Sequence, residues 1–254
     1  MKFQIKDVKK AVEFIELIKL IKQLSQHVTF MCTGEQVYIQ VMDNSHVCLV
    51  DLTIPNSWFH IYESKNITFS ISTNIMCKIC SMYTLDSVIE IIVDEENPDK
   101  MNIHLLHNLQ NKLFCIPLMD IDKDTLTPSD IDTKLDFQMN TKILEKYVNE
   151  LSQFGEDIII ECRNDKIYLC TEGIEGKLNV EIDNDKLDEF NVIEDYNFKG
   201  SYSIKYLQYV TKLFISYPSI NLYLDENNPL MISFTCTDIK IKMFIAPKCS
   251  DSDE

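Results

Sequence analysis

Two short motifs in the chain could bind a metal ion. Cys77-x-x-Cys80 has the spacing of half a zinc site, and His104-x-x-His107 places two imidazoles in one segment. The cysteine pair has no second pair at ligand spacing, and its segment has helical periodicity, so we interpret it as structural. The histidines lie in strand-like sequence, where residues three apart point to opposite faces. We therefore predict neither a metal site nor a cofactor.

Clustered carboxylates could support a different chemistry. Asp94, Glu95 and Glu96 stand in a row and could hold divalent metal ions in a nuclease or phosphoesterase. A similar segment at residues 225–229 carries only two acids before a turn, which favours a solvated hairpin tip at both places. The sequence has no phosphate-binding glycine loop, serine nucleophile elbow or His-Glu-x-x-His motif. We expect a protein that is not an enzyme, and a metal-dependent nuclease is the less favoured alternative.

The positions of the lysines are more informative. The chain has 24 lysines and arginines against 40 acidic residues, a net charge of −16, and Arg163 is its only arginine. Nucleic-acid binding would require lysines gathered on one surface, and base-specific readout by arginine is disfavoured. Nine lysines fall in segments with helical periodicity: Lys9, Lys10, Lys19, Lys22, Lys78, Lys142, Lys146, Lys205 and Lys212.

Two pairs of these lysines share a helix face. Lys142 and Lys146 are four residues apart, and Lys205 and Lys212 are seven apart. In a single helix, a solvated polar face explains such a pair. Because the pattern occurs in both halves of the chain, and acids concentrate in turns, we predict a basic helical surface that holds a phosphate backbone without reading bases.

Hydrophobic periodicity predicts the elements that carry these lysines. Apolar residues at spacings of three and four predict helices over residues 9–25, 73–81, 141–153 and 203–214. Alternating or continuous apolar runs predict strands over residues 37–52, 88–93, 158–162 and 220–224. Four helices among many strands, without regular βαβ alternation, predict an α+β fold with antiparallel sheets.

The two halves of the chain repeat one pattern. The Leu-Ser-Gln of residues 24–26 recurs at 151–153, and residues 94–98 match 225–229. Two copies predict tandem domains, since a solenoid needs three or more units. The predicted organisation is an N-terminal domain over residues 1–118, an exposed acidic connector over 119–134 and a C-terminal domain with an acidic tail over 135–254.

The overall composition is typical of a soluble globular protein, with 45% apolar and 25% charged residues. The first residues alternate in charge, and no stretch approaches about 18 apolar residues, so we expect neither a signal peptide nor a membrane span. The nine cysteines are expected to be reduced, in a cytosolic or nuclear compartment.

Residues 42–50 (Met-Asp-Asn-Ser-His-Val-Cys-Leu-Val), 118–122 (Leu-Met-Asp-Ile-Asp) and 245–248 (Ile-Ala-Pro-Lys) closely resemble segments of the proliferating cell nuclear antigen (PCNA) family, the eukaryotic-type DNA sliding clamps. The similarity extends over essentially the whole chain. It implies the DNA-clamp fold, with two similar domains, and a homotrimer closed head to tail, whose helices line a central channel. Such a ring would encircle double-stranded DNA independently of sequence and serve as a DNA polymerase processivity factor in replication and repair.

The resemblance also implies roles for individual residues. The positions that match the family's DNA-binding lysines are Lys22, Lys78, Lys142, Lys146, Lys205 and Lys212. One subunit-interface edge would be the strand 110–116, and the opposing edge the segment 177–181 with support from the third helix. The interface residues would be Phe114, Val148, Leu151, Phe154, Leu178 and Val180, for which the alternative reading is plain core.

By the same resemblance, DNA polymerase, ligase and nuclease would dock through short clamp-binding peptides, and a clamp-loader ATPase would place the ring on DNA. The matching pocket residues are Met42, His46, Leu49, Leu126, Pro128, Pro229, Phe244, Ala246 and Pro247. From sequence alone, His46 is a turn histidine. The expected location is the nucleus, or a viral replication compartment if the source is a virus. A monomeric clamp-like adaptor, which binds partners without encircling DNA, is the remaining alternative.

Overall fold

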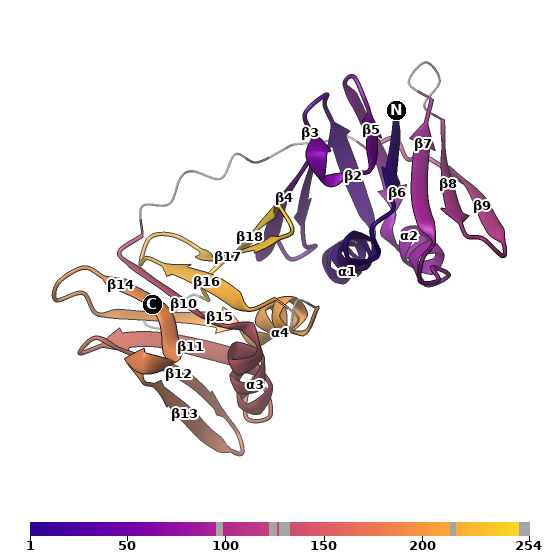
Figure 1. Cartoon of the computed structure of the whole chain (residues 1–254). Coiled ribbons are helices and arrows are strands. Elements are labelled where there is room, and N and C mark those ends of the chain that lie inside the picture. The colour runs from indigo at the N-terminus through magenta and orange to yellow at the C-terminus, as the bar shows by residue number, and fades with distance from the viewer. Residues whose placement is uncertain (95–98, 122–125, 127–132, 214–216, 249–254) are drawn as a thin grey trace. The chain divides into compact units, whose positions relative to one another are not determined.

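The computed structural model describes residues 1–94, 99–121, 126, 133–213 and 217–248 (Figure 1). The chain forms two compact units. The first comprises residues 1–46, 50–126 and 235–241, and the second comprises 47–49, 127–234 and 242–254. Each unit is described by itself.

The first unit contains two antiparallel sheets and two helices. One sheet has the strand order β5-β1-β7-β8-β9, and the other includes the neighbouring strands β4-β3-β2-β6. The elements in chain order are β1 (Lys2–Ile5), α1 (Val8–Leu24), β2 (His27–Cys32), β3 (Gln36–Met42), β4 (Cys48–Pro55), η1 (Asn56–Trp58), β5 (Ile61–Glu63), β6 (Ile67–Ser72), α2 (Thr73–Cys80), β7 (Val88–Val93), β8 (Lys100–Leu106) and β9 (Asn111–Pro117).

The second unit repeats this plan. One sheet has the order β13-β12-β11-β15, and the other includes the neighbouring strands β14-β10-β16-β17-β18. The elements are β10 (Leu135–Asn140), α3 (Thr141–Leu151), β11 (Asp157–Arg163), β12 (Lys166–Gly173), β13 (Gly176–Ile182), η2 (Asn184–Lys186), β14 (Leu187–Val192), β15 (Phe198–Ser203), α4 (Ile204–Leu213), β16 (Ser219–Leu224), β17 (Leu230–Cys236) and β18 (Ile239–Ile245). Residues 235–241 of the last two strands are counted with the first unit.

Local sequence explains where the longer helices begin and end. The Asp7 carboxylate accepts a hydrogen bond from the Lys10 N–H at 3.0 Å and caps α1. Asn140 caps α3 in the same way, through the Lys142 N–H at 3.0 Å. A side-chain oxygen at this position satisfies one of the free N–H groups of the first turn. Ser25 and Ser152, the middle residues of the repeated Leu-Ser-Gln, are the C-caps of α1 and α3.

The helices pack as one pair in each unit. Figure 1 shows α1 beside α2, and α3 beside α4, and residues of each pair are in contact. Their apolar faces are buried in the core: Leu17 and Ile18 on α1 and Leu207 on α4 are at most 2% exposed. Burial of each such side chain contributes about 1.5–3 kcal/mol. This packing leaves the polar faces of the helices, with their lysines, toward solvent.

The predicted α+β class and all four predicted helices are confirmed, with ends that differ by at most two residues. The single predicted strand over residues 37–52 is wrong. Strands β3 and β4 are separated by a turn in which Asp43 accepts from the His46 N–H at 3.0 Å and His46 has a left-handed φ of 56°. Alternating apolar residues on both sides of the turn hide it from a periodicity argument. In the described part of the chain, no helix is sufficiently long and apolar to cross a membrane.

Candidate functional site

The four helices concentrate positive charge in an acidic chain. Their sequences hold nine lysines and four acidic residues, whereas the whole chain has a net charge of −16. Helices α2 and α4 contain no acidic residue. One of the four acids, Glu13, is only 3% exposed, so it contributes little to the solvent-facing surface. The helical faces are therefore the basic surface of each unit.

The structure separates the predicted DNA-binding lysines into two groups. Lys146 lies 3.8 Å from the Glu150 carboxylate, so part of its charge is compensated locally. The others form no ion pair within the described part of the chain, and all are exposed: Lys22, Lys78, Lys142, Lys205 and Lys212. Lys205 also lies over the Tyr206 ring at 4.5 Å. These five ammonium groups are available to an external anion.

Three helical lysines without an assigned role are engaged by the chain itself. Lys19 pairs with Glu16 at 2.7 Å, and Lys9 lies 4.0 Å from Glu13. Lys10 donates to the Trp58 carbonyl oxygen at 2.6 Å. These contacts set them apart from the five unpaired lysines.

The Cys77-x-x-Cys80 pair lies on α2 and serves the packing of α1 against α2. The Cys77 thiol donates to the Ile18 carbonyl oxygen at 3.7 Å. Burial raises the pKa of Cys77, and it raises the pKa of Cys80 to about 12. Both groups are therefore protonated thiols at neutral pH. Neither thiol is therefore activated as a thiolate nucleophile by its surroundings.

The acidic segment at residues 225–229 also has a structural explanation. Asp225 is 5% exposed and accepts from the Asn227 N–H at 2.8 Å and the Asn228 side-chain amide at 3.1 Å. Lys134 lies 3.8 Å from the same carboxylate. These contacts fix a turn and leave Asp225 little capacity to hold a metal ion. Glu95 and Glu96 lie outside the described residues.

In each unit, one sheet has an outermost strand with backbone groups that no neighbouring strand pairs. Within the described chain, β9 pairs only with β8, and β13 pairs only with β12. Both strands alternate half-buried apolar residues with exposed ones. Phe114 lies on the half-buried face of β9, and Leu178 and Val180 lie on that of β13. An edge strand of this length is a template for pairing with another chain.

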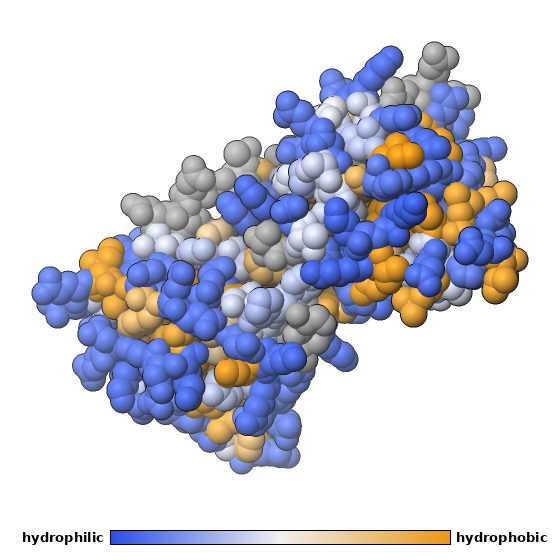
Figure 2. All heavy atoms as spheres, in the orientation of Figure 1, coloured by the Kyte–Doolittle hydropathy of each residue, from blue (hydrophilic) through white to orange (hydrophobic). Residues whose placement is uncertain are grey.

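Exposed apolar residues accompany β9. Leu113 is 66% exposed and Leu109, in the preceding turn, is 88% exposed. Figure 2 shows hydrophobic surface in the region where Figure 1 places β8 and β9. Sequence reasoning missed Leu113, although it immediately precedes Phe114 in the strand.

Val148 and Leu151, which the resemblance assigns to a subunit interface, are both 0% exposed and lie in the core under α3. Their burial favours the alternative reading of these two residues as plain core. Phe154, just after the helix, is 39% exposed. The Phe154 backbone packs closely against Gly173, at the end of β12. A Cβ at position 173 would lie only 1.9 Å from the Phe154 carbonyl oxygen. Only glycine permits that approach.

The predicted partner-pocket residues are divided between the two units. In the first unit, Met42 is half-buried, His46 is exposed and Leu126 is 49% exposed. In the second unit, the Ala246 N–H donates to the Val47 carbonyl oxygen at 2.8 Å. The other members in the second unit are Leu49, Pro229, Phe244 and Pro247. Pro128 lies outside the described residues.

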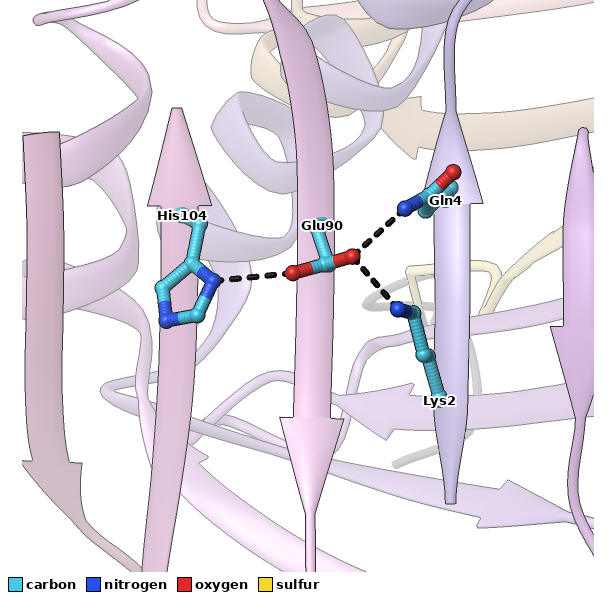
Figure 3. A network of polar contacts seen from close by, with 4 residues as sticks. All are labelled: Lys2, Gln4, Glu90 and His104. Atoms are coloured by element: carbon cyan, nitrogen blue, oxygen red, sulfur yellow. Dashed lines mark hydrogen bonds and ion pairs between the residues drawn. The ribbon is translucent and has the colours of Figure 1, made fainter. Parts of the chain in front are cut away.

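A buried carboxylate ties three strands of the first sheet together (Figure 3). Glu90 on β7 accepts from Lys2 at 2.8 Å and from the Gln4 side-chain amide at 2.5 Å, both on β1, and it bonds to His104 Nδ1 on β8 at 2.8 Å. Burial would raise the pKa of Glu90, but the hydrogen bonds from Lys2, Gln4 and His104 outweigh it and lower the pKa to about 2. His104 therefore has a structural partner.

Comparison with known proteins places this geometry in a family. Residues 4–126 match the family described as "Proliferating cell nuclear antigen, N-terminal domain", and residues 129–249 match "Proliferating cell nuclear antigen, C-terminal domain". A similar protein is the "Probable DNA polymerase sliding clamp" of Autographa californica nuclear polyhedrosis virus. It is 27% identical over 247 residues, which cover 94% of this chain and 93% of that protein.

A solved structure with a similar fold is that of PCNA from Thermococcus kodakaraensis. Its TM-score is 0.88 at 17% sequence identity, and the match covers 97% of this chain and 99% of that one. This similarity concerns the fold. Because the two family matches together span almost the whole chain, the protein belongs to the proliferating cell nuclear antigen family of sliding clamps.

Proposed function

We propose that three copies of this chain close head to tail around double-stranded DNA and act as a processivity factor for a DNA polymerase. The observation that carries the proposal is the reversal of charge on the helices. Five exposed, unpaired lysines lie on α1 to α4 of a chain with a net charge of −16. Lysine ammonium groups bind phosphates as point charges and carry no base specificity.

Weak contacts of this kind suit a protein that must move along DNA. A ring holds DNA by topology, so its inner surface needs little affinity. Lysine–phosphate contacts release counterions, do not depend on sequence and can be exchanged from one phosphate to the next. The acidic remainder of the chain would repel DNA from the outer surface. This combination favours sliding over tight binding.

Ring closure would use the two edge strands. Pairing of β9 of one subunit with β13 of the next would continue the sheets across the boundary and satisfy their free backbone groups. Phe114 would then face Leu178 and Val180, with Phe154 alongside. A head-to-tail contact of two different surfaces closes into a ring when the rotation between subunits suits.

Polymerase, ligase and nuclease would dock through short peptides on the proposed partner site, defined by Met42, His46, Leu49, Leu126, Pro128, Pro229, Phe244, Ala246 and Pro247. A clamp-loader ATPase would open and place the ring. Tethering raises the effective concentration of each enzyme at the template without any chemistry by the clamp. We place this activity in the nucleus or in a viral replication compartment, and similarity to a baculovirus protein supports a role in viral replication.

The test reverses two lysine charges on one helix. Lys205→Glu with Lys212→Glu should weaken binding of a short duplex at low ionic strength, measured by fluorescence anisotropy. It should also reduce the slope of log affinity against log salt, by about 0.9 for each phosphate that the variant no longer neutralises. The solution mass should not change, because both residues belong to α4 and neither is part of the edge strands β9 and β13.

The matched control is Lys240→Glu with Lys242→Glu. It changes the charge equally, at two exposed lysines on strand β18. We expect this control to bind the duplex with nearly the wild-type salt slope. Equally weakened binding in both double variants would mean that net charge, and not the helical surface, governs binding, and the proposal would fail.

A further inference from the structure

A run of hydrogen bonds links strand β3 to Leu126. The Gln40 side-chain NH₂ donates to the Leu126 carbonyl oxygen at 2.8 Å, and the Leu126 N–H donates to Gln40 Oε1, also at 2.8 Å. One side-chain amide thus satisfies both backbone groups of a residue 86 positions away. A neighbouring strand would make the same pair of bonds.

A second pair of residues fixes the orientation of the Gln40 amide. The Tyr38 hydroxyl donates its single hydrogen to Asp51 at 2.7 Å, so it can only accept from Gln40. The Gln40 NH₂ donates to that hydroxyl at 3.0 Å. Burial and the hydrogen bond to Asp51 raise the pKa of Tyr38, so the hydroxyl keeps its hydrogen. The amide therefore presents Oε1 to the Leu126 N–H, the only arrangement that satisfies every group.

Tyr38 and Gln40 lie on the same face of β3 as Met42, which belongs to the proposed partner site. Burial alternates along β3, with Tyr38, Gln40 and Met42 on the half-buried face. Leu126 is bonded to this face while 49% of its surface stays exposed. Its side chain is thus free to contact another molecule although its backbone is held.

We propose that Gln40 is a positioning residue, which holds Leu126 against β3 as a preformed wall for a partner peptide. The inference rests on the proposed function, because Leu126 belongs to the proposed partner site. Without the two bonds, peptide binding would have to order the Leu126 backbone, and the entropy cost of that ordering would weaken affinity.

Hydrogen exchange at the Leu126 amide tests the bond directly and needs no partner. Gln40→Leu keeps the approximate size of the side chain and removes the amide. We expect exchange at Leu126 to be at least roughly tenfold faster than in the wild type, since removal of both bonds leaves the amide in solvent. Tyr38→Phe, which removes only the orienting hydroxyl, should give an intermediate rate.

Gln36→Leu is the matched control. Gln36 is a glutamine on the same face of β3, four residues earlier, and its side chain does not bond to Leu126. Exchange at Leu126 should be unchanged in this variant. Thermal unfolding of both leucine variants shows whether the fold is retained to the same extent.

Binding of a synthetic fluorescent peptide, with one apolar and two aromatic side chains on a turn of helix, tests the purpose of the bond. Gln40→Leu should weaken binding roughly tenfold, and Gln36→Leu less than twofold. Unchanged exchange at Leu126, or unchanged peptide affinity, in Gln40→Leu would overturn the proposal. If the peptide does not bind the wild type, the partner site itself is refuted together with the purpose of Gln40, while faster exchange would still establish that Gln40 holds Leu126.

Discussion

At the scale of single residues, Glu90 illustrates how a buried carboxylate contributes to stability. Its hydrogen bonds to Lys2, Gln4 and His104 join strands β1, β7 and β8, and β8 supports the edge strand β9 (Figure 3). The pKa of Glu90 is lowered to about 2, so folding favours the ionised form. A lowered pKa stabilises the fold above the ordinary carboxylate pKa, and this stabilisation is lost as the pH falls toward the folded value.

Glu90→Gln should therefore destabilise the protein in a pH-dependent way. We expect the free energy of unfolding to fall by about 2 kcal/mol at pH 7, and the difference from the wild type to shrink between about pH 4.5 and pH 2. Urea unfolding at a series of pH values measures this. Glu63→Gln, an exposed carboxylate on the neighbouring strand β5, is the control and should show little change. A deficit of the same size at pH 7 and pH 3 would mean that the charge of Glu90 is unimportant.

The sequence predicted some properties of single residues and missed others. The exposure of the helical lysines could be predicted, because the exposed face of a helix follows from its periodicity. The roles of Val148 and Leu151 could not be decided from sequence, since an apolar residue on a helix has the same pattern whether it faces its own core or another chain. Gln40 was not identified, because its bonding partner is 86 residues away and strand alternation alone says nothing about distant contacts.

At the scale of elements, the internal repeat is the strongest predictor. The serine of the repeated Leu-Ser-Gln is the C-cap of both α1 and α3, with an extended backbone at Ser25 and a helical one at Ser152, and both units contain antiparallel sheets beside a helix pair. Helix positions followed from sequence because each helix has its own apolar period. The position of the turn between β3 and β4 did not follow from sequence. It depends on a left-handed His46 whose N–H donates to the Asp43 carbonyl oxygen, and hydrophobic patterns do not detect such a turn.

The edge strand β13 carries the element-scale prediction. Val180→Asp places a charge on its half-buried face, where the proposed partner is β9 of the next subunit. Burial of an unpaired carboxylate in that contact is costly, so the variant should dissociate to single chains of about 30 kDa at micromolar concentration. Light scattering coupled to size exclusion measures the mass.

The control for this variant is the adjacent Asn179→Asp, on the exposed face of the same strand. It adds the same charge and retains the side-chain oxygen that accepts from the Cys170 thiol at 2.9 Å. Its mass should match that of the wild type. If Val180→Asp also keeps the wild-type mass, β13 is not the closing edge.

At the scale of the whole molecule, the positive charges are distributed unevenly. A net charge of −16 would oppose contact with DNA if it were evenly spread, yet nine of the 24 basic residues lie on four helices. The proposed encirclement of DNA would account for this segregation, since a surface that faces DNA and a surface that faces solvent need opposite charges. Composition showed the excess of negative charge, and the positions of the helices showed where the positive charge gathers.

The most direct test of ring formation is the mass of the wild-type protein in solution. We predict about 90 kDa, three times the 29.6 kDa chain, by analytical ultracentrifugation at micromolar concentration and moderate salt. This mass corresponds to the three chains of the proposed ring. A mass of about 30 kDa that stays constant as the concentration rises would contradict the proposal and favour an adaptor that binds partners without encircling DNA.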